Sequence, residues 1–133
     1  MFKKWSKSNP FPVKRIEKLT GTKNPKEGDS CVRCPDVPYS TMEILIKEGL
    51  IDPSEVQNDS PTVKAFLKHL KFVSDRTVFL TYVVYPPRDD MRITIEGFKV
   101  KDVNNEECCS LMGKFKKADE MTNDNNCVRF WWD

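Results

Sequence analysis

The spacing of hydrophobic positions divides the chain into a helical part and a strand part. Between residues 39 and 71 the apolar side chains recur every three or four positions, and the clearest stripe is Val63, Phe66, Leu67 and Leu70. This period is typical of amphipathic helices. In Arg76–Tyr85 and Met91–Val100 the apolar residues alternate or fill both parities, and β-branched residues are frequent. That pattern favours strands, so the sequence predicts helices first and an antiparallel hairpin after them.

Three helix starts are predicted, each at a polar residue able to accept a hydrogen bond from the backbone: Ser40, Asp52 and Ser60. Glu43 completes a capping box with Ser40, and the helix predicted for 41–48 ends before Gly49. Prolines follow the other two caps directly, where proline suits the first helical position. They predict a single turn over 53–56 and a longer helix from Pro61 that carries the stripe.

Gly97 interrupts the second predicted strand and shifts its hydrophobic pattern by one residue. Ile93 and Ile95 share one parity, whereas Phe98 and Val100 have the other. An extra residue in one strand has this effect, so we predict a β-bulge at Gly97. The expected centre of the core combines the helix stripe with strand positions: Phe66, Leu67, Leu70, Val78, Leu80, Tyr82, Ile93 and Ile95.

The last 30 residues have a weaker pattern. Apolar residues between 108 and 115 have helical spacing, although Gly113 opposes a helix. Residues 122–126 are polar and favour a turn, and Cys127–Trp132 alternates as a closing strand. Taken together, the elements predict an α+β fold with about three short helices packed on a small antiparallel β-sheet.

The composition of residues 1–38 predicts an extended arm that wraps or precedes this fold. Five of the nine prolines lie there and oppose long regular elements, although a short helical turn around Val13–Leu19 fits the pattern. We expect a basic arm over 1–38, with its first 20 residues less well packed than residues 40–100, and a single globular domain over 39–133.

Charge strengthens this division. The first 26 residues carry eight basic side chains and one acid, whereas the other 107 carry 14 basic and 19 acidic ones. Such an arm attracts anionic partners, which are lipid headgroups or nucleic acid. The residues expected to bind an anionic surface are Lys3, Lys4, Trp5, Lys7, Lys14, Arg15 and Lys18. Aromatic residues 2, 5 and 11 favour lipid, whereas a second basic face at Lys64, Lys68 and Lys71 gives nucleic acid another contact.

Cys31 and Cys34 form the only CxxC pair. Two such thiolates can reach one zinc ion, with Cys108, Cys109, Cys127 or His69 completing the site. A second spaced pair is missing, so we expect no metal, no cofactor and ordinary reduced cysteines. The chain has none of the common catalytic or nucleotide-binding motifs, and His69 has no companion motif, so we expect no enzyme.

Trp131 and Trp132 close the chain on a predicted strand, where side chains alternate. One of the two should therefore face the core and the other should be exposed or cover a partner. A short basic arm followed by a compact α+β body is similar in layout to small viral matrix proteins and viral accessory proteins.

Two functions fit these patterns. The first is a non-enzymatic binding protein whose arm docks an anionic membrane or nucleic acid while its body binds protein partners or further copies of itself. The alternative is a protein–protein inhibitor or adaptor that acts through the acidic body, with a purely structural arm. The chain lacks a secretory pattern and any apolar run of about 20 residues. We expect an intracellular protein, cytoplasmic or nuclear, with peripheral membrane attachment as a further option.

Overall fold

The computed structural model describes residues 2–25 and 28–133 and shows an α+β fold. The helices in these residues are α1 (Val13–Thr20), α2 (Tyr39–Lys47), α3 (Val63–Leu70), the 3₁₀ helix η1 (Lys71–Arg76) and α4 (Asn105–Lys114). The strands are β1 (Cys31–Arg33), β2 (Val37–Pro38), β3 (Thr77–Val84), β4 (Arg92–Val100), β5 (Glu120–Asp124) and β6 (Cys127–Trp131).

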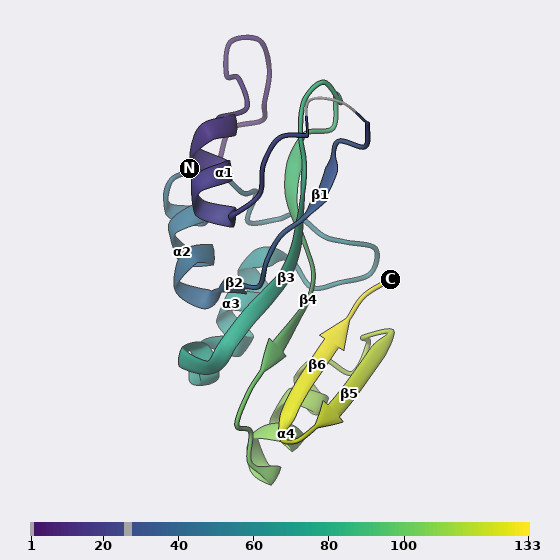
Figure 1. The fold of residues 1–133 in the computed structure, drawn as a ribbon. Coiled ribbons are helices and arrows are strands. Elements are labelled where there is room, and N and C mark those ends of the chain that lie inside the picture. The colour runs from purple at the N-terminus through teal and green to yellow at the C-terminus, as the bar shows by residue number, and fades with distance from the viewer. Residues whose placement is uncertain (1, 26–27) are drawn as a thin grey trace.

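All six strands form one antiparallel sheet. The order is β1-β3-β4-β6-β5, and β2 also pairs with β3. Figure 1 shows α3 and α4 behind this sheet, whereas its lower half carries no helix of the described residues on the side turned to the viewer. The sheet therefore has a covered face and an open face.

The β3–β4 hairpin and its bulge are confirmed. Leu80 pairs with Gly97 and Thr81 with Ile95, so Glu96 is the extra residue on β4. The bulge keeps the strand's apolar side chains on one face, because Ile93 and Ile95 before it and Phe98 after it are all buried in the same core.

The core lies between the covered face and the helices, with Phe66 of α3 at its centre. Phe66 has aromatic contacts with Phe79, Phe98, Phe115 and Trp132 at centroid distances from 5.2 to 6.2 Å. The predicted core residues Phe66, Leu70, Ile93 and Ile95 are confirmed, and Leu67 packs on the core while half-buried.

The predicted parity of β3 is wrong. Phe79 and Val83 face the core, whereas Val78 and Leu80 lie half-buried on the other face. Tyr82 is buried outside the core cluster, where its hydroxyl donates to Gln57 Oε1 at 3.0 Å. Because β3 carries apolar residues on both parities, alternation alone does not identify its inner face.

Part of the predicted arm is built into the fold. Strands β1 and β2 both pair with β3, and Val37 is buried. Helix α1 fits the helical turn expected near Val13–Leu19, and its Ile16 is fully buried. Residues 31–38 thus lie along the domain, which is the wrapping alternative, and the pairing has a physical reason: β3 would otherwise present a long unpaired edge.

The predicted helix starts need correction. Helix α2 begins at Tyr39 after Pro38, with no side-chain cap, so Ser40 is already inside the helix. Asp52 accepts a hydrogen bond from the Ser54 amide in a turn, and no helix forms over 53–56. The cap of α3 is Thr62, which accepts from the Ala65 amide at 3.1 Å, and not Ser60. Serine and aspartate side chains accept backbone hydrogen bonds both at helix N-caps and in turns. The residue types at these three sites therefore do not show whether a helix or a turn begins there.

The last 30 residues, whose hydrophobic pattern was weak, form one helix and two strands. Asn104 and Glu107 form a capping box that starts α4, and the helix buries Leu111 despite Gly113. The closing strand β6 is confirmed. The polar turn predicted for 122–126 is shorter, because β5 runs to Asp124 and the chain reverses at Asn125 and Asn126, both with positive φ.

Candidate functional site

The lysines of the arm are available to a partner. Lys3, Lys4, Lys7, Lys14 and Lys18 are all exposed. Arg15 is exposed as well, but its guanidinium donates to both carboxylate oxygens of Glu48 at 2.7 and 2.5 Å. This ion pair lowers the pKa of Glu48 and leaves Arg15 less suited to an external anion.

The aromatic residues of the arm pack onto the body. Trp5 contacts Phe2 and Phe11 edge-to-face at 5.6 and 5.3 Å, and Phe11 contacts Tyr85 at 6.0 Å. Phe11 is buried and Trp5 is half-buried. The three rings thus hold residues 2–11 against the core. The sequence had suggested that Phe11 could insert into a lipid interface, but its burial makes it unavailable for this.

A larger basic surface lies on the helix side of the molecule. Residues 60–72 and 112–118 contain six lysines and no acidic residue. We call this surface the helix-side lysine cluster, and it consists of Lys64, Lys68, Lys71, Lys114, Lys116 and Lys117, all exposed. Among the described residues, none of the six takes part in an ion pair.

Two contacts join the halves of the cluster. The ammonium of Lys114 lies 4.1 Å from the ring centroid of Phe72, and it donates to the carbonyl of His69 at 3.4 Å. Lys116 and Lys117 line a cavity of about 240 Å³ together with Asp59 and Pro61, just before α3, so one carboxylate borders the cluster. Phe72 is 45% exposed, so an apolar ring stands among the lysines.

The two C-terminal tryptophans divide as expected. Trp132 is buried in the aromatic core, and its indole N–H finds no acceptor among the described residues. Trp131 is half-buried on the open face of the sheet. The guanidinium carbons of Arg33 and Arg129 lie 5.2 and 4.6 Å from its ring centroid.

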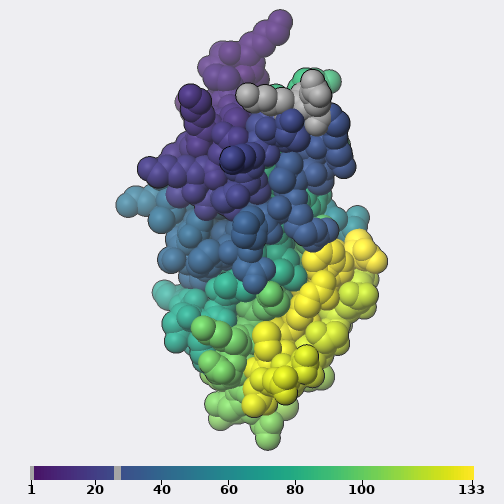
Figure 2. Space-filling model, viewed as in Figure 1, coloured from purple at the N-terminus to yellow at the C-terminus, as the bar shows by residue number. Residues whose placement is uncertain are grey.

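The open face owes its shape to the pairing of β3, β4 and β6. Leu80, Gly97 and Trp131 form one row across these strands, and Val78, Lys99 and Arg129 form the next. Arg33 forms an ion pair with Glu96 through both guanidinium nitrogens, and burial raises the pKa of Glu96. Figure 2 shows this face, where β6 (yellow) lies beside the segment that contains β1 (blue), in agreement with the contact between Trp131 and Arg33.

Of the CxxC pair, Cys31 lies in β1 and Cys34 follows the strand directly. Cys34 is half-buried beside Thr81 and Thr20, and burial raises the pKa of its thiol to about 12. Within residues 2–25 and 28–133, no group of three histidine, cysteine, aspartate or glutamate side chains is placed to hold a metal ion. The thiol of Cys34 is therefore protonated near neutral pH.

Two features were missed from the sequence. Lys114, Lys116 and Lys117 join the predicted second basic face only because α4 ends beside α3. The run Lys114-Phe115-Lys116-Lys117 shows in the sequence that this segment is basic. It does not show that the segment lies beside Lys64, Lys68 and Lys71. The Arg33–Trp131 contact joins opposite ends of the chain and depends on strand order, which the sequence pattern does not provide.

Comparison of the chain with models of protein families, with curated proteins and with solved structures finds no match. In the part of the chain that the structure describes, no helix is long and apolar enough to cross a membrane.

Proposed function

We propose that this chain is a non-enzymatic binding protein that attaches to anionic membrane surfaces through its exposed lysines. The observation that carries the proposal is the helix-side lysine cluster, whose six exposed lysines form no ion pair among the described residues, with the exposed ring of Phe72 in contact with Lys114. The lysines of the arm, Lys3, Lys4, Lys7, Lys14 and Lys18, supply further attraction.

Phe72 favours a membrane over nucleic acid as the anionic surface. Phosphate contacts on nucleic acid need cations alone, whereas peripheral attachment to lipid combines cations with apolar side chains that enter the interface. A ring 45% exposed among lysines supports the lipid reading. The rings of Trp5 and Phe11 are less available, because they pack on the body.

The expected strength comes from the number of lysines. Each cation near an acidic bilayer contributes about 1 kcal/mol, and this contribution falls with ionic strength. Replacing Lys64, Lys68 and Lys71 by glutamine should therefore weaken attachment by about 3 kcal/mol, or roughly 100-fold. Phe72→Ser should weaken it by about 1–2 kcal/mol through lost apolar burial.

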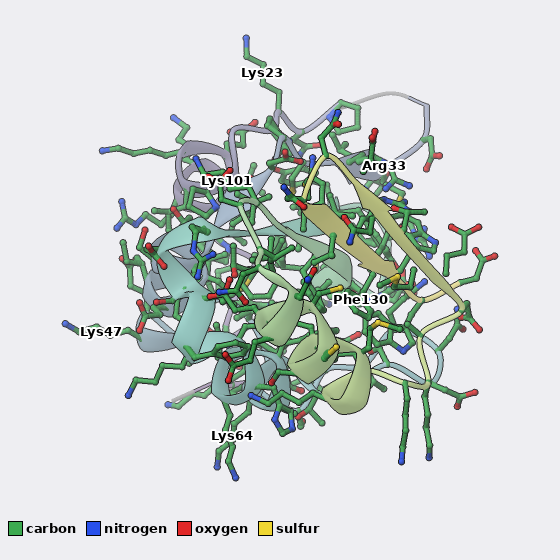
Figure 3. The ribbon with its side chains drawn as sticks, turned by 90° about the horizontal axis from the view of Figure 1, so that it is seen from below. Lys23, Arg33, Lys47, Lys64, Lys101 and Phe130 are labelled. Atoms are coloured by element: carbon green, nitrogen blue, oxygen red, sulfur yellow. The ribbon has the colours of Figure 1, made fainter. Side chains whose placement is uncertain are left out.

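The test is sedimentation of the full chain with phosphatidylcholine vesicles that contain or lack phosphatidylserine. The matched control replaces Lys23, Lys47 and Lys101 by glutamine, three exposed lysines that lie apart from Lys64 in Figure 3. We expect binding to anionic vesicles only, a large loss in the Lys64/Lys68/Lys71 variant and a small loss in the control.

Equal losses in the two triple variants would show that total charge acts without a specific surface. Tight binding to duplex DNA that depends on Lys64, Lys68 and Lys71, with no binding to vesicles, would replace the membrane by nucleic acid.

A further inference from the structure

The cavity between the end of α4 and the segment before α3 has a wall that carries a buried hydrogen-bond donor without an acceptor. This wall is Trp132, which is 1% exposed, and its indole N–H has no partner among the described residues. Buried polar groups in native proteins are nearly always hydrogen-bonded, and a donor left unpaired is costly. An acceptor that reached this N–H would therefore bind favourably.

We propose that this cavity binds a phosphomonoester group, held by lysine ammonium groups and by the Trp132 N–H. At a membrane the group would belong to a lipid headgroup, and this lipid part rests on the membrane attachment proposed above. The cavity itself can be tested without a membrane, because a soluble phosphomonoester has the same chemistry.

The charges around the cavity favour an anion. Lys114, Lys116 and Lys117 line it, and none of the three forms an ion pair among the described residues. Lys114 already donates to the His69 carbonyl, so Lys116 and Lys117 are the more available cations. Asp59 and the carbonyl end of α4 oppose an anion, but that helix end carries only about half a negative charge, so positive charge is in excess.

The donors around the cavity select a ligand that only accepts hydrogen bonds. Lysine ammonium and indole N–H groups donate and do not accept. Ser60 in the same wall adds no free donor, because its hydroxyl already donates to the Pro61 carbonyl. A phosphomonoester carries nearly two negative charges near neutral pH and has three strong acceptor oxygens. A phosphodiester or a carboxylate has one charge and fewer free oxygens, so it matches this donor set less well.

The size of the cavity fits a phosphate together with the small group that carries it. A volume of about 240 Å³ equals that of roughly eight water molecules at about 30 Å³ each. This is more than a bare phosphate ion fills, and it is smaller than the usual site of a drug-sized ligand. Glycerol phosphate has a suitable size, and it is also the headgroup of phosphatidic acid.

The Trp132 N–H is closed to solvent, so an oxygen reaches it only when the cavity wall shifts. The indole is fixed by the aromatic core, where Phe66 and Phe115 lie 5.2 and 6.0 Å from it. The lysines of the wall are exposed and have long side chains. We expect these lysines, rather than the indole, to move when a ligand binds.

The test is a titration of the ¹⁵N-labelled full chain with glycerol 3-phosphate at constant ionic strength, followed by NMR of the indole N–H groups. The chain has three tryptophans, and Trp132→Phe identifies the Trp132 signal by its loss. We expect a saturable downfield shift of the Trp132 indole proton, because it gains an acceptor. The signals of Trp5 and Trp131, which do not line the cavity, should stay unchanged.

A double variant tests the part of the lysines with the same NMR signal. Lys116→Gln with Lys117→Gln should weaken the binding of glycerol 3-phosphate about tenfold or more, because hydrogen bonds between charged groups are the strong ones. The matched control is Lys23→Gln with Lys47→Gln, two exposed lysines outside the cavity. The control should bind as the unchanged chain does.

Vesicles test whether a lipid supplies the phosphomonoester. At equal surface charge, phosphatidic acid vesicles should bind the chain about tenfold more tightly than phosphatidylserine vesicles, because the phosphate of phosphatidylserine is a diester. The variant with Lys116 and Lys117 replaced by glutamine should lose this preference.

Two results would overturn the proposed cavity site: a Trp132 indole proton that does not shift with glycerol 3-phosphate, and a shift that sodium chloride reproduces. Equal binding to the two anionic lipids would overturn the lipid part and leave attachment through exposed lysines standing. A shifted Trp132 proton without binding to any anionic vesicle would overturn membrane attachment and support a site for a soluble phosphomonoester.

Discussion

Gly97→Ala tests how closely β4 and β6 pack at the bulge. The added Cβ would lie 2.2 Å from the Phe130 carbonyl oxygen and 3.1 Å from the Trp131 Cα. Both are backbone atoms, so no side chain can rotate away, and β6 must move back by about 1 Å to reach ordinary contact.

The cost follows from the packing that this movement disturbs. Overpacking of a tight site costs about 1–3 kcal/mol, and each weakened ladder hydrogen bond adds about 0.5–1.5 kcal/mol. Gly97 pairs with Trp131, and Phe98 with the buried Phe130, so at least one such bond is affected. We expect a loss of about 2–4 kcal/mol in the free energy of unfolding, and a melting temperature lower by roughly 10 °C.

Urea unfolding followed by tryptophan fluorescence measures this change, and Gly113→Ala is the matched control. A Cβ at Gly113 meets nothing within 4 Å, and the residue lies in α4. The control should stabilise the protein by about 0.5–1 kcal/mol, because alanine is the better helix former. A loss below about 0.5 kcal/mol for Gly97→Ala would refute the close β4–β6 approach, since it would lie within the range of ordinary surface substitutions.

Three further outcomes are expected. Phe66→Ala should cost about 3–5 kcal/mol in urea unfolding, and a change under half of that would show that α3 packs elsewhere. Glu107 accepts from Arg76 at 3.0 and 2.5 Å, and this pairing lowers its pKa from 4.5 to about 2. Its stabilisation is present above pH 4.5 and lost as pH falls towards 2, so Glu107→Gln should lower the melting temperature at pH 7 and have little effect near pH 2. In mass-spectrometric alkylation at pH 8, exposed Cys109 should react well before Cys34, whose thiol pKa is raised to about 12 by burial; equal rates would contradict that burial.

The elements with one clear apolar face were predictable from the sequence. The stripe of α3 placed Phe66 and Leu70 correctly in the core. The shift of pattern at Gly97 located the bulge, because the change of parity is itself a sequence feature. In both cases a single local signal determines which side chains turn inward.

Features that depend on neighbours were not predictable in the same way. β3 is apolar on both parities, and only the position of the helices selects Phe79 over Val78 as the inward side chain. Strands β1 and β2 are three and two residues long, so their sequences carry almost no period. Their place in the sheet follows from the free edge of β3.

In the candidate sites, too, some features follow from the local sequence and others depend on neighbouring segments. Local spacing placed Lys64, Lys68 and Lys71 on one helix face and separated Trp131 from Trp132. The partners of these residues come from distant segments, as Lys114 does beside Phe72 and Arg33 does beside Trp131. Their recognition required the packing of α4 on α3 and the order of the strands.

Hydrogen–deuterium exchange of the full chain on phosphatidylserine-containing vesicles tests the central claim most directly. If the helix-side lysine cluster faces the bilayer, amides in residues 60–72 and 112–118 should exchange more slowly on anionic vesicles than in solution, with no such change on neutral ones. Amides of β6 on the open face should exchange equally in both. Protection confined to β6, or no protection at residues 60–72 while the protein is bound, would contradict attachment through this surface.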